Sequence, residues 1–566
     1  RGVDAAVKIN VPESWKTLAD DTKAPDASLP HYIREIQIPV NKQAGDAIPV
    51  SEFMPYADGV TPSETSKYEK RGIAVKVPKW IPENCIGCNK CALVCPHAAI
   101  RPFLLNAEEE AAKPAAFVTK EAKGKGFEGL TFRMQVDPLD CQGCGACANV
   151  CPAKEKALVM ELLDTQMPEQ ENWEHALTLS TKTNPMDKFT VRGSQFERPL
   201  YEFSGACAGC GEAPYMKLMS QLFGDRMFVT SATGCAYVVG SSTPSFPYVA
   251  NEKGHGPANS NSLFEDNAEY ALGMKLSIDQ MRRQMAAHAE AVVASTSDAA
   301  LKSALEAWLA EGDNGDKTRA LSEAVVAALN ATAETSDDIA FLKANKDALP
   351  KKSVWMYGGD GWAYDIGFGG LDHVLASGAD VNVLVVDTEV YSNTGGQASK
   401  ATQLGAVAQF ANGGKRTGKK DLGAIAMTYG NVYVAQVAMG ANEQHLITAL
   451  KEAEAHHGPS ILIAYAPCIN HGISKGMSQA QLEEKLASEC GYWPLWRYVP
   501  ELKAEGKNPF ILTSKEPNGQ LLDFMMGEAR FASLTRTFPE TAKVLFAEAE
   551  EFCAQRYAKY KHLAEQ

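Results

Sequence analysis

The sequence predicts an α/β fold with a doubly wound, mostly parallel sheet, preceded by a smaller α+β domain. Apolar runs of strand length recur in the second half of the chain, and a glycine-rich stretch with helical character separates two of them. A pair of closely spaced cysteine runs in the first third of the chain marks the smaller domain. The length of 566 residues leaves room for both.

The composition is that of an ordinary globular protein, with 45% hydrophobic and 22% charged residues. A net charge of −14 argues against a nucleic-acid-binding protein, which would show a basic patch or stripe. No apolar run reaches the length of a membrane span, so no transmembrane helix and no membrane partner are expected. Residues 1–4 do not resemble a signal peptide, and the missing initial Met suggests a processed chain or one piece of a larger polypeptide.

Eight of the 14 cysteines fall in two identical runs with the spacing C-x2-C-x2-C-x3-C-P. This spacing is that of bacterial two-cluster ferredoxins, in which the fourth Cys of each run binds the cluster of the other run. Zinc and disulfides are weaker alternatives, because both runs are complete and end in Pro, and no secretion signal is visible. One [4Fe-4S] cluster is therefore assigned to Cys85, Cys88, Cys91 and Cys151, and the other to Cys141, Cys144, Cys147 and Cys95.

A looser group of cysteines follows the two runs. Cys207 and Cys210 form a C-x2-C in a loop of small residues, and Cys235 comes shortly after. Free cysteines are often buried as small hydrophobic residues, so these three do not by themselves define a cluster. The candidates for a fourth thiolate are Cys468, Cys490 and Cys553. Cys468 follows the apolar run 461–465, at a strand end where α/β sheets place functional groups, whereas the other two lie in amphipathic helical stretches.

A βαβ unit is predicted between residues 353 and 387. The apolar run 353–357 leads into Gly-Asp-Gly, a helical stretch covers 363–375, and a second strand spans 381–387. The loops after both strands suit a magnesium diphosphate. Asp360 can supply a carboxylate, and Thr388, Val390 and Asn393 can complete the octahedron. Gly-Asp-Gly with an Asn in the following loop is the signature of thiamine diphosphate enzymes, although a bare Gly-Asp-Gly is a weak signal.

Together these residues resemble one family, pyruvate:ferredoxin oxidoreductase, also called pyruvate synthase. The matching stretches are 80–85 with its cysteine repeat, 205–212, 262–269, 359–365, 387–400 and 465–468. The resemblance implies a third [4Fe-4S] cluster close to thiamine diphosphate, with the ligands Cys207, Cys210, Cys235 and Cys468. It also implies a magnesium ion bound by Asp360, Thr388 and the carbonyl of Val390.

The resemblance further implies which residues contact thiamine diphosphate. The matching positions are Glu212, Cys235, Phe264, Asp360, Gly361, Trp362, Ala363, Thr388, Glu389, Val390, Tyr391, Ser392 and Asn393. Asn393 also matches a residue that faces the substrate, so it is the catalytic candidate. Core packing is the alternative interpretation for Phe264.

The activity implied is oxidative decarboxylation of pyruvate with coenzyme A to acetyl-CoA and CO2, with electrons passing one at a time through three [4Fe-4S] clusters to ferredoxin or flavodoxin. In the family, N-terminal domains activate thiamine and bind pyruvate and coenzyme A. This chain is therefore expected to be the cofactor and electron-transfer half, working with those domains in a cytoplasmic homodimer. The alternatives are another 2-oxoacid:ferredoxin oxidoreductase and a non-catalytic electron-transfer module, which would not need the Gly-Asp-Gly site.

Four segments are expected along the chain. Residues 1–60 form the tail of a preceding domain and a linker, and residues 61–165 form the two-cluster ferredoxin-like domain. Residues 166–200 are a polar connector. Residues 201–566 form the thiamine diphosphate-binding α/β domain, with a helical insertion near 285–349 that contains two or three helices.

Overall fold

The computed structural model describes residues 5–18 and 26–566, so residues 1–4 and 19–25 of the expected N-terminal tail and linker lie outside the described part. The chain divides into two compact units, Arg1–Pro62 and Ser63–Gln566. In its described part, the first unit contains short helical segments and no strand. These segments are Glu13–Thr17, Ile33–Gln37, α1 (Ile38–Asn41), Gly45–Ala47 and Val50–Tyr56.

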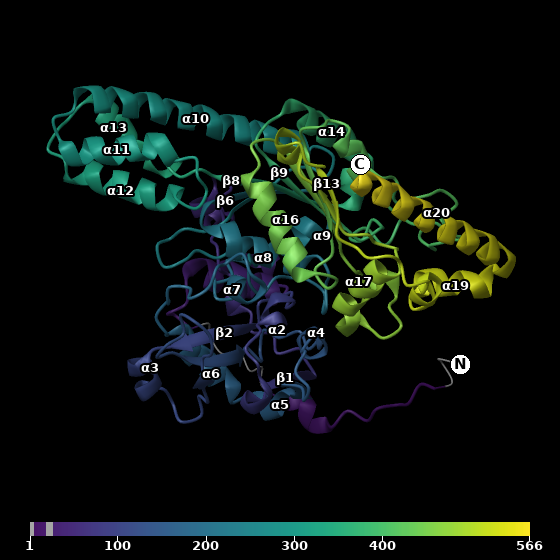
Figure 1. Ribbon diagram of the computed structural model, residues 1–566. Coiled ribbons are helices and arrows are strands. Elements are labelled where there is room, and N and C mark those ends of the chain that lie inside the picture. Colours follow the sequence, from purple (N-terminus) through teal and green to yellow (C-terminus); the bar gives the residue numbers. More distant parts are fainter. Residues whose placement is uncertain (1–4, 19–25) are drawn as a thin grey trace. The chain divides into compact units, whose positions relative to one another are not determined.

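The second unit begins with a small α+β domain, drawn in dark blue in Figure 1. Its strands pair antiparallel, β1 with β5 and β4 with both β2 and β3. Two short helices, α2 and α4, begin inside the two cysteine runs, each after a residue with positive φ: Asn89 at 61° and Gly145 at 79°. The bounds are β1 (Lys76–Trp80), β2 (Ile100–Leu105), β3 (Lys120–Glu121), β4 (Thr131–Val136), β5 (Leu158–Leu162), α2 (Lys90–Leu93), α3 (Ala107–Ala112), α4 (Ala146–Asn149) and α5 (Leu163–Gln166).

An eight-stranded sheet organises the rest of this unit, in the order β13-β12-β10-β11-β9-β8-β6-β7. The strands from β10 to β7 pair in parallel, and only β12 and β13 at one edge run antiparallel. The sheet is therefore mostly parallel, as predicted. The bounds are β6 (Met227–Ser231), β7 (Ala258–Asn261), β8 (Ser353–Gly359), β9 (Asn382–Asp387), β10 (Tyr433–Val437), β11 (Ser460–Tyr465), β12 (Trp496–Tyr498) and β13 (Phe510–Leu512).

Helices cover both faces of this sheet, because its central strands are apolar on both sides. In β9, Val383 and Val385 belong to one hydrophobic cluster, and Leu384 and Val386 belong to another. The first cluster includes α14 (Phe368–Ser377), α15 (Leu422–Met427) and α20 (Pro539–Glu565), and the second includes α8 (Ala213–Phe223) and α16 (Glu443–Ala455). Continuous apolar strands of this kind are typical of parallel sheets buried between helices. The doubly wound α/β class is confirmed.

The α+β domain packs on the α8 side of the sheet. Leu93, Val94 and Ala146 of that domain join the same hydrophobic cluster as α8 and α16. Lys90 forms an ion pair with Glu443 at 2.6 Å. The cysteine runs are thus held against the α/β domain by both apolar and charged contacts.

Four helices form an extension beside the sheet, seen in teal in Figure 1. Its core contains Met285, Leu305, Trp308 and Leu329. The sequence predicted two or three helices near 285–349, but the first helix begins earlier because its first half packs against β8 and α14 as well. The helices are α10 (Asn267–Ser295), α11 (Ala299–Glu311), α12 (Thr318–Ala331) and α13 (Asp337–Ala344).

The predicted connector contains α6 (Glu169–Leu177) and α7 (Val191–Ser194), and a short α9 (Cys235–Val238) follows β6. The C-terminal part adds α17 (Ala480–Glu489), α18 (Leu521–Met526) and α19 (Ala529–Thr537). None of the helices in the described part of the chain combines the length and the hydrophobicity that a membrane span requires.

Candidate cofactor and cluster site

Three oxygen atoms predicted to bind magnesium converge at the carboxyl ends of β8 and β9. These strands are parallel neighbours, so Asp360 and Thr388, which follow them directly, lie side by side. The hydroxyl of Thr388 donates to Oδ1 of Asp360 at 3.0 Å and lies 3.0 Å from the carbonyl oxygen of Val390. One carboxylate, one hydroxyl and one carbonyl form an all-oxygen donor set, which fits a hard cation such as Mg²⁺.

The carboxylate of Asp360 is fully buried and held on both oxygens. The backbone N–H of Thr388 donates to Oδ1 at 3.1 Å, and the hydroxyl of Ser399 donates to Oδ2 at 2.6 Å. Burial, and then the nearby Asp387 carboxylate, raise the pKa of Asp360 to about 8. A bound cation would favour the ionised form and offset this cost.

Glu212 lies near the same site, immediately before α8. Its side chain is buried, and burial followed by the Asp360 charge raises its pKa to about 8. Its Oε2 has no hydrogen-bond partner among the described residues. A buried carboxyl oxygen without a partner is uncommon, and a ligand that donates a hydrogen bond would satisfy it.

The aromatic candidates lie at different depths. The side chains of Trp362 and Ala363 belong to the hydrophobic core, so only their backbone atoms are available to a cofactor. Phe264 is half-buried and lies 5.9 Å from the Tyr391 ring, edge to face. A side chain at Gly361 would meet the Tyr391 ring at 2.8 Å, so this position requires glycine.

Glu389 directs its side chain away from the predicted cofactor. Its backbone has a φ of 61°, in the left-handed region that non-glycine residues rarely adopt. The carboxylate is fully buried and contacts Arg530 at 2.7 Å, Tyr492 at 2.5 Å and Lys419 at 3.3 Å. These partners lie on the interior side of the loop from Asp387 to Val390 and hold it in place.

The third group of cysteines meets the loop that follows β9. The hydroxyl of Ser392 donates to the sulfur of Cys235 at 3.3 Å, and the exposed Asn393 also donates to that sulfur. The Gly211 N–H donates to the carbonyl of Pro467 at 3.1 Å, which holds the C-x2-C loop beside Cys468. Burial raises the pKa of Cys468, and the neighbouring Cys207 contributes in the same direction. The structure thus brings together the four cysteines Cys207, Cys210, Cys235 and Cys468.

The eight cysteines of the two runs lie in two neighbouring groups. A small cavity is lined by Cys95 from the first run and by Cys141, Cys144 and Cys147 from the second. Burial raises the pKa of Cys91, and its thiol neighbours are Cys88, Cys85 and Cys151. The fourth Cys of each run therefore lies with the other run, as the ferredoxin spacing requires.

Two of the three cysteine sets are in direct contact. The N–H of Gly209, inside the C-x2-C loop, donates to the sulfur of Cys144. Gly209 has a φ of 76°, and a side chain there would meet the carbonyl of Met477 at 2.6 Å. Close packing around Gly209 therefore places the set that contains Cys207 and Cys210 beside the set that contains Cys144.

Cys490 and Cys553 lie in the hydrophobic core, in keeping with their interpretation as structural residues. In the described ranges, no group of three or more His, Cys, Asp and Glu side chains is gathered closely enough to bind one metal ion, so the cysteines of each set are neighbours but do not form a single-ion site. The predicted magnesium donors contain only one such side chain, because the other two are a hydroxyl and a carbonyl.

Several residues that support the site were not predicted. Ser399 binds Asp360, and the ring Nε2 of His471 contacts the carbonyl of Thr388 at 2.7 Å. Arg530 also pairs with Glu528 at 2.7 Å, and both are buried. Ser399 and His471 lie 39 and 83 residues from these partners, and Arg530 lies 141 residues from Glu389, so no spacing pattern could have identified them.

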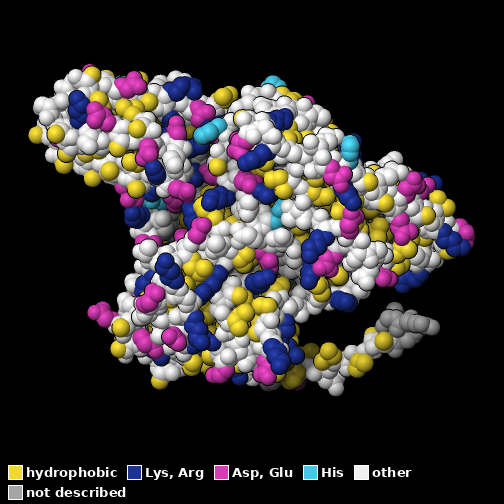
Figure 2. All heavy atoms as spheres, viewed as in Figure 1, with side chains coloured by type: hydrophobic (Ala, Val, Ile, Leu, Met, Phe, Trp, Pro, Cys, Tyr) yellow, Lys and Arg dark blue, Asp and Glu magenta, His cyan; other side chains and the backbone are white. Residues whose placement is uncertain are grey.

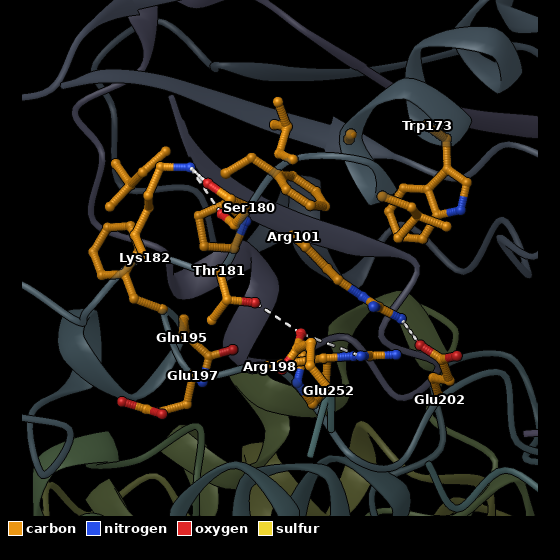
Figure 3. Close-up of a pocket in the computed structure, with 18 of the residues that line it drawn as sticks. Arg101, Trp173, Ser180, Thr181, Lys182, Gln195, Glu197, Arg198, Glu202 and Glu252 are labelled. Atoms are coloured by element: carbon orange, nitrogen blue, oxygen red, sulfur yellow. Dashed lines mark hydrogen bonds and ion pairs between the residues drawn. The ribbon is translucent and has the colours of Figure 1, made fainter. Parts of the chain in front are cut away.

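A cavity of about 500 Å³ lies away from these residues, between β2 and the connector (Figure 3). Its walls include Arg101, which pairs with Glu202, and Arg198, which pairs with Glu252. Thr181 donates to the same Glu252 at 2.7 Å. These cations are neutralised within the wall, and none of the predicted site residues lines the cavity.

Comparison with family models identifies three domains in the chain. Residues 82–154 match a 4Fe-4S dicluster domain, and residues 324–464 match the C-terminal TPP-binding domain of thiamine pyrophosphate enzymes. Residues 20–74 match a domain of unknown function named EKR. The two cluster-binding runs and the Asp360 site thus lie in domains that bind [4Fe-4S] clusters and thiamine diphosphate.

Curated relatives match the chain over its full length. The pyruvate:ferredoxin oxidoreductase of Moorella thermoacetica is 54% identical over 571 aligned residues, covering 100% of this chain and 48% of that protein. The pyruvate-flavodoxin oxidoreductase of Klebsiella pneumoniae is 52% identical, with the same coverage of 100% and 48%. The chain therefore spans about half the length of these relatives.

Among solved structures, a 2-oxoglutarate:ferredoxin oxidoreductase from Magnetococcus marinus covers 47% of this chain and 65% of its own, at 16% identity and a TM-score of 0.29. That likeness is too low to bear on the fold. The sequence relatives, the dicluster domain and the thiamine pyrophosphate-binding domain agree with one another. The chain belongs to the pyruvate:ferredoxin (flavodoxin) oxidoreductase family, as a stretch that spans about half the length of its members.

Proposed function

We propose that this chain is the cofactor and electron-transfer half of an enzyme that oxidises pyruvate with coenzyme A to acetyl-CoA and CO2, with ferredoxin or flavodoxin as acceptor. The observation that carries the proposal is the contact between Ser392 and Cys235 at 3.3 Å. It joins the loop that bears the magnesium donors to a cysteine set that can bind a redox cluster. A domain that only transfers electrons has no need of this junction.

Each part of the site has a role in this proposal. Asp360, Thr388 and the Val390 carbonyl would hold Mg²⁺ and, through it, the diphosphate of the cofactor. Thiamine diphosphate, when bound, supplies carbanion stabilisation for decarboxylating a 2-oxo acid, and [4Fe-4S] clusters carry single electrons. Asn393 is exposed beside Cys235, where it can face a substrate.

The packing of the cysteine sets supports one order of electron transfer. The set with Cys235 adjoins the magnesium loop, and Gly209 joins that set to the one that contains Cys144. The remaining set, with Cys88 and Cys151, adjoins the set that contains Cys144, because Cys91 is a near neighbour of Cys147. We propose that electrons leave the chain from this last set.

The surface near the last set suits an acidic electron acceptor. Lys79, Lys154 and Lys156 are exposed in this domain, as are the side chain of Ile86 and two carboxylates, those of Glu83 and Glu155. In Figure 2 the lower part of the molecule, which contains this domain, presents Lys and Arg side chains interspersed with Asp, Glu and apolar ones. Complementary charge speeds association between proteins and orients them. We further propose that the chain works together with the remaining domains of the family, and that the assembled enzyme is a homodimer. We place it in the cytoplasm, where the thiols are kept reduced.

Cofactor analysis of the anaerobically purified chain tests the proposal. Three cubane clusters predict about twelve irons per chain, together with one thiamine diphosphate. The D360N variant should lose thiamine diphosphate and keep its iron, because the hydrogen-bond partners of the Asp360 carboxylate among the described residues are Thr388 and Ser399, and neither is a cluster cysteine. D372N is the matched control, since Asp372 lies on α14 and accepts a hydrogen bond from Tyr429 at 2.7 Å. A fully loaded protein with eight irons and no thiamine diphosphate would contradict the enzyme function.

A further inference from the structure

Lys217 is a cation buried between the α/β domain and the dicluster domain. It lies on α8 and is 1% exposed. Its Nζ donates to the carbonyl oxygen of Leu93 at 2.8 Å and to that of Ala92. These two residues lie between Cys91, of the first predicted cluster, and Cys95, of the second. Lys217 therefore binds the short segment that links the two clusters.

The contacts of Lys217 fit a charged ammonium group. An ammonium has three N–H groups, and the third acceptor is the side-chain oxygen of Gln195 at 3.4 Å. All three acceptors are uncharged, and no carboxylate pairs with Lys217 in the part of the chain that the structure describes. A buried cation without a counter-charge is costly. The negative groups acting on it are Cys95 and Cys91, which oppose the lowering of its pKa to about 7 by burial.

Arg192 is a second such cation, close to Lys217 in the fold, because its helix contacts both α8 and α2. It lies on α7 in the connector, and its guanidinium stacks on the Phe127 ring at 4.4 Å from the centroid. Its Nη2 is 3.8 Å from where a side chain at Gly87 would begin. Within the described residues its Nε has no hydrogen-bond partner and no carboxylate pairs with it. The one negative group found to act on it is Cys88.

We propose that Lys217 and Arg192 are the counter-charges of the dicluster centre and set the reduction potentials of its two clusters. The inference rests on the proposed function, because the negative charge is that of the bound clusters and their thiolates. Lys217 acts on both clusters, and more on the one held by Cys95. Arg192 acts on the cluster held by Cys88. Both are positioning residues, and both come from outside the ferredoxin-like segment.

The physical reason is electrostatic. Reduction adds one electron to a cluster and neither forms nor breaks a bond, so the cluster becomes more negative by one charge. A nearby cation stabilises the reduced state and raises the potential, and it does so strongly where water is excluded. Removing the cation should therefore make the cluster harder to reduce.

The test is a redox titration of the anaerobically purified, iron-loaded protein with dithionite, followed by EPR. In K217M, the reduction equilibrium of both dicluster centres should fall about tenfold, which is about 59 mV for a one-electron couple. The cluster held by Cys95 should show the larger shift. K217R keeps the charge and should restore the wild-type potentials.

R192M should lower the potential of the Cys88 cluster alone, and the third set should be unchanged in every variant. The matched control is K275M, since Lys275 is also a buried cation but pairs with Asp279 at 2.8 Å on α10. It should leave all potentials unchanged.

Unchanged potentials in iron-loaded K217M and R192M, or equal shifts in K275M, would overturn the inference. If K217M does not fold, R192M and K217R still test the inference. R192M must lower the potential of the Cys88 cluster, and K217R must leave the potentials of both dicluster centres unchanged. A wild-type protein without iron would instead refute the proposed function, so the two failures can be told apart.

Discussion

Removing Arg530 should loosen the loop that carries the magnesium donors. Arg530 is 4% exposed and pairs with two fully buried carboxylates, Glu389 and Glu528, each at 2.7 Å. In R530M, Glu389 keeps Lys419 at 3.3 Å, but among the described residues Glu528 is left with His471 at 3.6 Å. Breaking a buried ion pair from one side costs about 3 to 5 kcal/mol. We expect the upper part of this range, because two carboxylates lose the same partner.

This cost can be measured at the loop itself. Glu389 lies between Thr388 and Val390 with a backbone conformation that its side-chain partners support. A loss of about 3 to 5 kcal/mol corresponds to a hundredfold to several-thousandfold rise in local opening. Hydrogen exchange of peptides covering 387–400 should therefore speed up by that factor, up to the limit set by global unfolding. The affinity for Mg²⁺ and thiamine diphosphate should fall in parallel.

R536M is the matched control, because Arg536 lies on the same helix, α19, and is exposed. Surface substitutions of this kind change stability by about 0.5 kcal/mol or less. If exchange in 387–400 is the same in R530M and the wild type, or equally faster in R536M, the buried pairs do not support the loop.

Three further predictions concern other parts of the chain. C468A should lose one cluster and keep two, so its iron content should fall by about a third; three unchanged EPR-active clusters would contradict the assignment. Burial raises the pKa of Glu484 to about 8, so the native state binds more protons than the unfolded state between the ordinary glutamate pKa and about 8. The free energy of unfolding should therefore fall as pH rises through that window, and in E484Q urea unfolding should show a weaker decline. W308A should destabilise the four-helix extension by about 3 to 5 kcal/mol, because Trp308 fills its core. Exchange should rise in 299–344 while thiamine diphosphate binding stays unchanged, and a loss of the cofactor would refute that separation.

The parts of the fold that the sequence predicted are those with a strong local pattern. The apolar runs at 353–357, 381–387 and 461–465 correspond to Ser353–Gly359, Asn382–Asp387 and Ser460–Tyr465. The antiparallel edge strands Trp496–Tyr498 and Phe510–Leu512 were not predicted. Three residues are too few to show a period. Trp496–Tyr498 forms because β10 offers it an edge, and Phe510–Leu512 then pairs with Trp496–Tyr498.

In the candidate site, too, residues in short local motifs could be predicted and residues joined by long-range contacts could not. The cysteine spacing and Gly-Asp-Gly are short motifs, so they could be found without the fold. His471 and Arg530 could not, because their partners Thr388 and Glu389 lie 83 and 141 residues away. Glu389 was grouped with the cofactor residues by its position in the loop, but its side chain turns into the interior. Only the three-dimensional packing shows that the backbone of Glu389 lies in the cofactor loop while its side chain belongs to the interior.

Gly209 has a consequence for how freely the chain can vary. Its N–H touches the sulfur of Cys144, and the Met477 carbonyl leaves no room for a side chain. The gap between the two sulfur sets is therefore determined by main-chain atoms, which are identical in every amino acid. Electron tunnelling weakens steeply with distance, so in the proposed electron route a gap of this kind would keep the transfer rate insensitive to substitutions nearby. Residues around Gly209 could then be substituted without slowing the proposed electron transfer, provided that position 209 itself stays glycine.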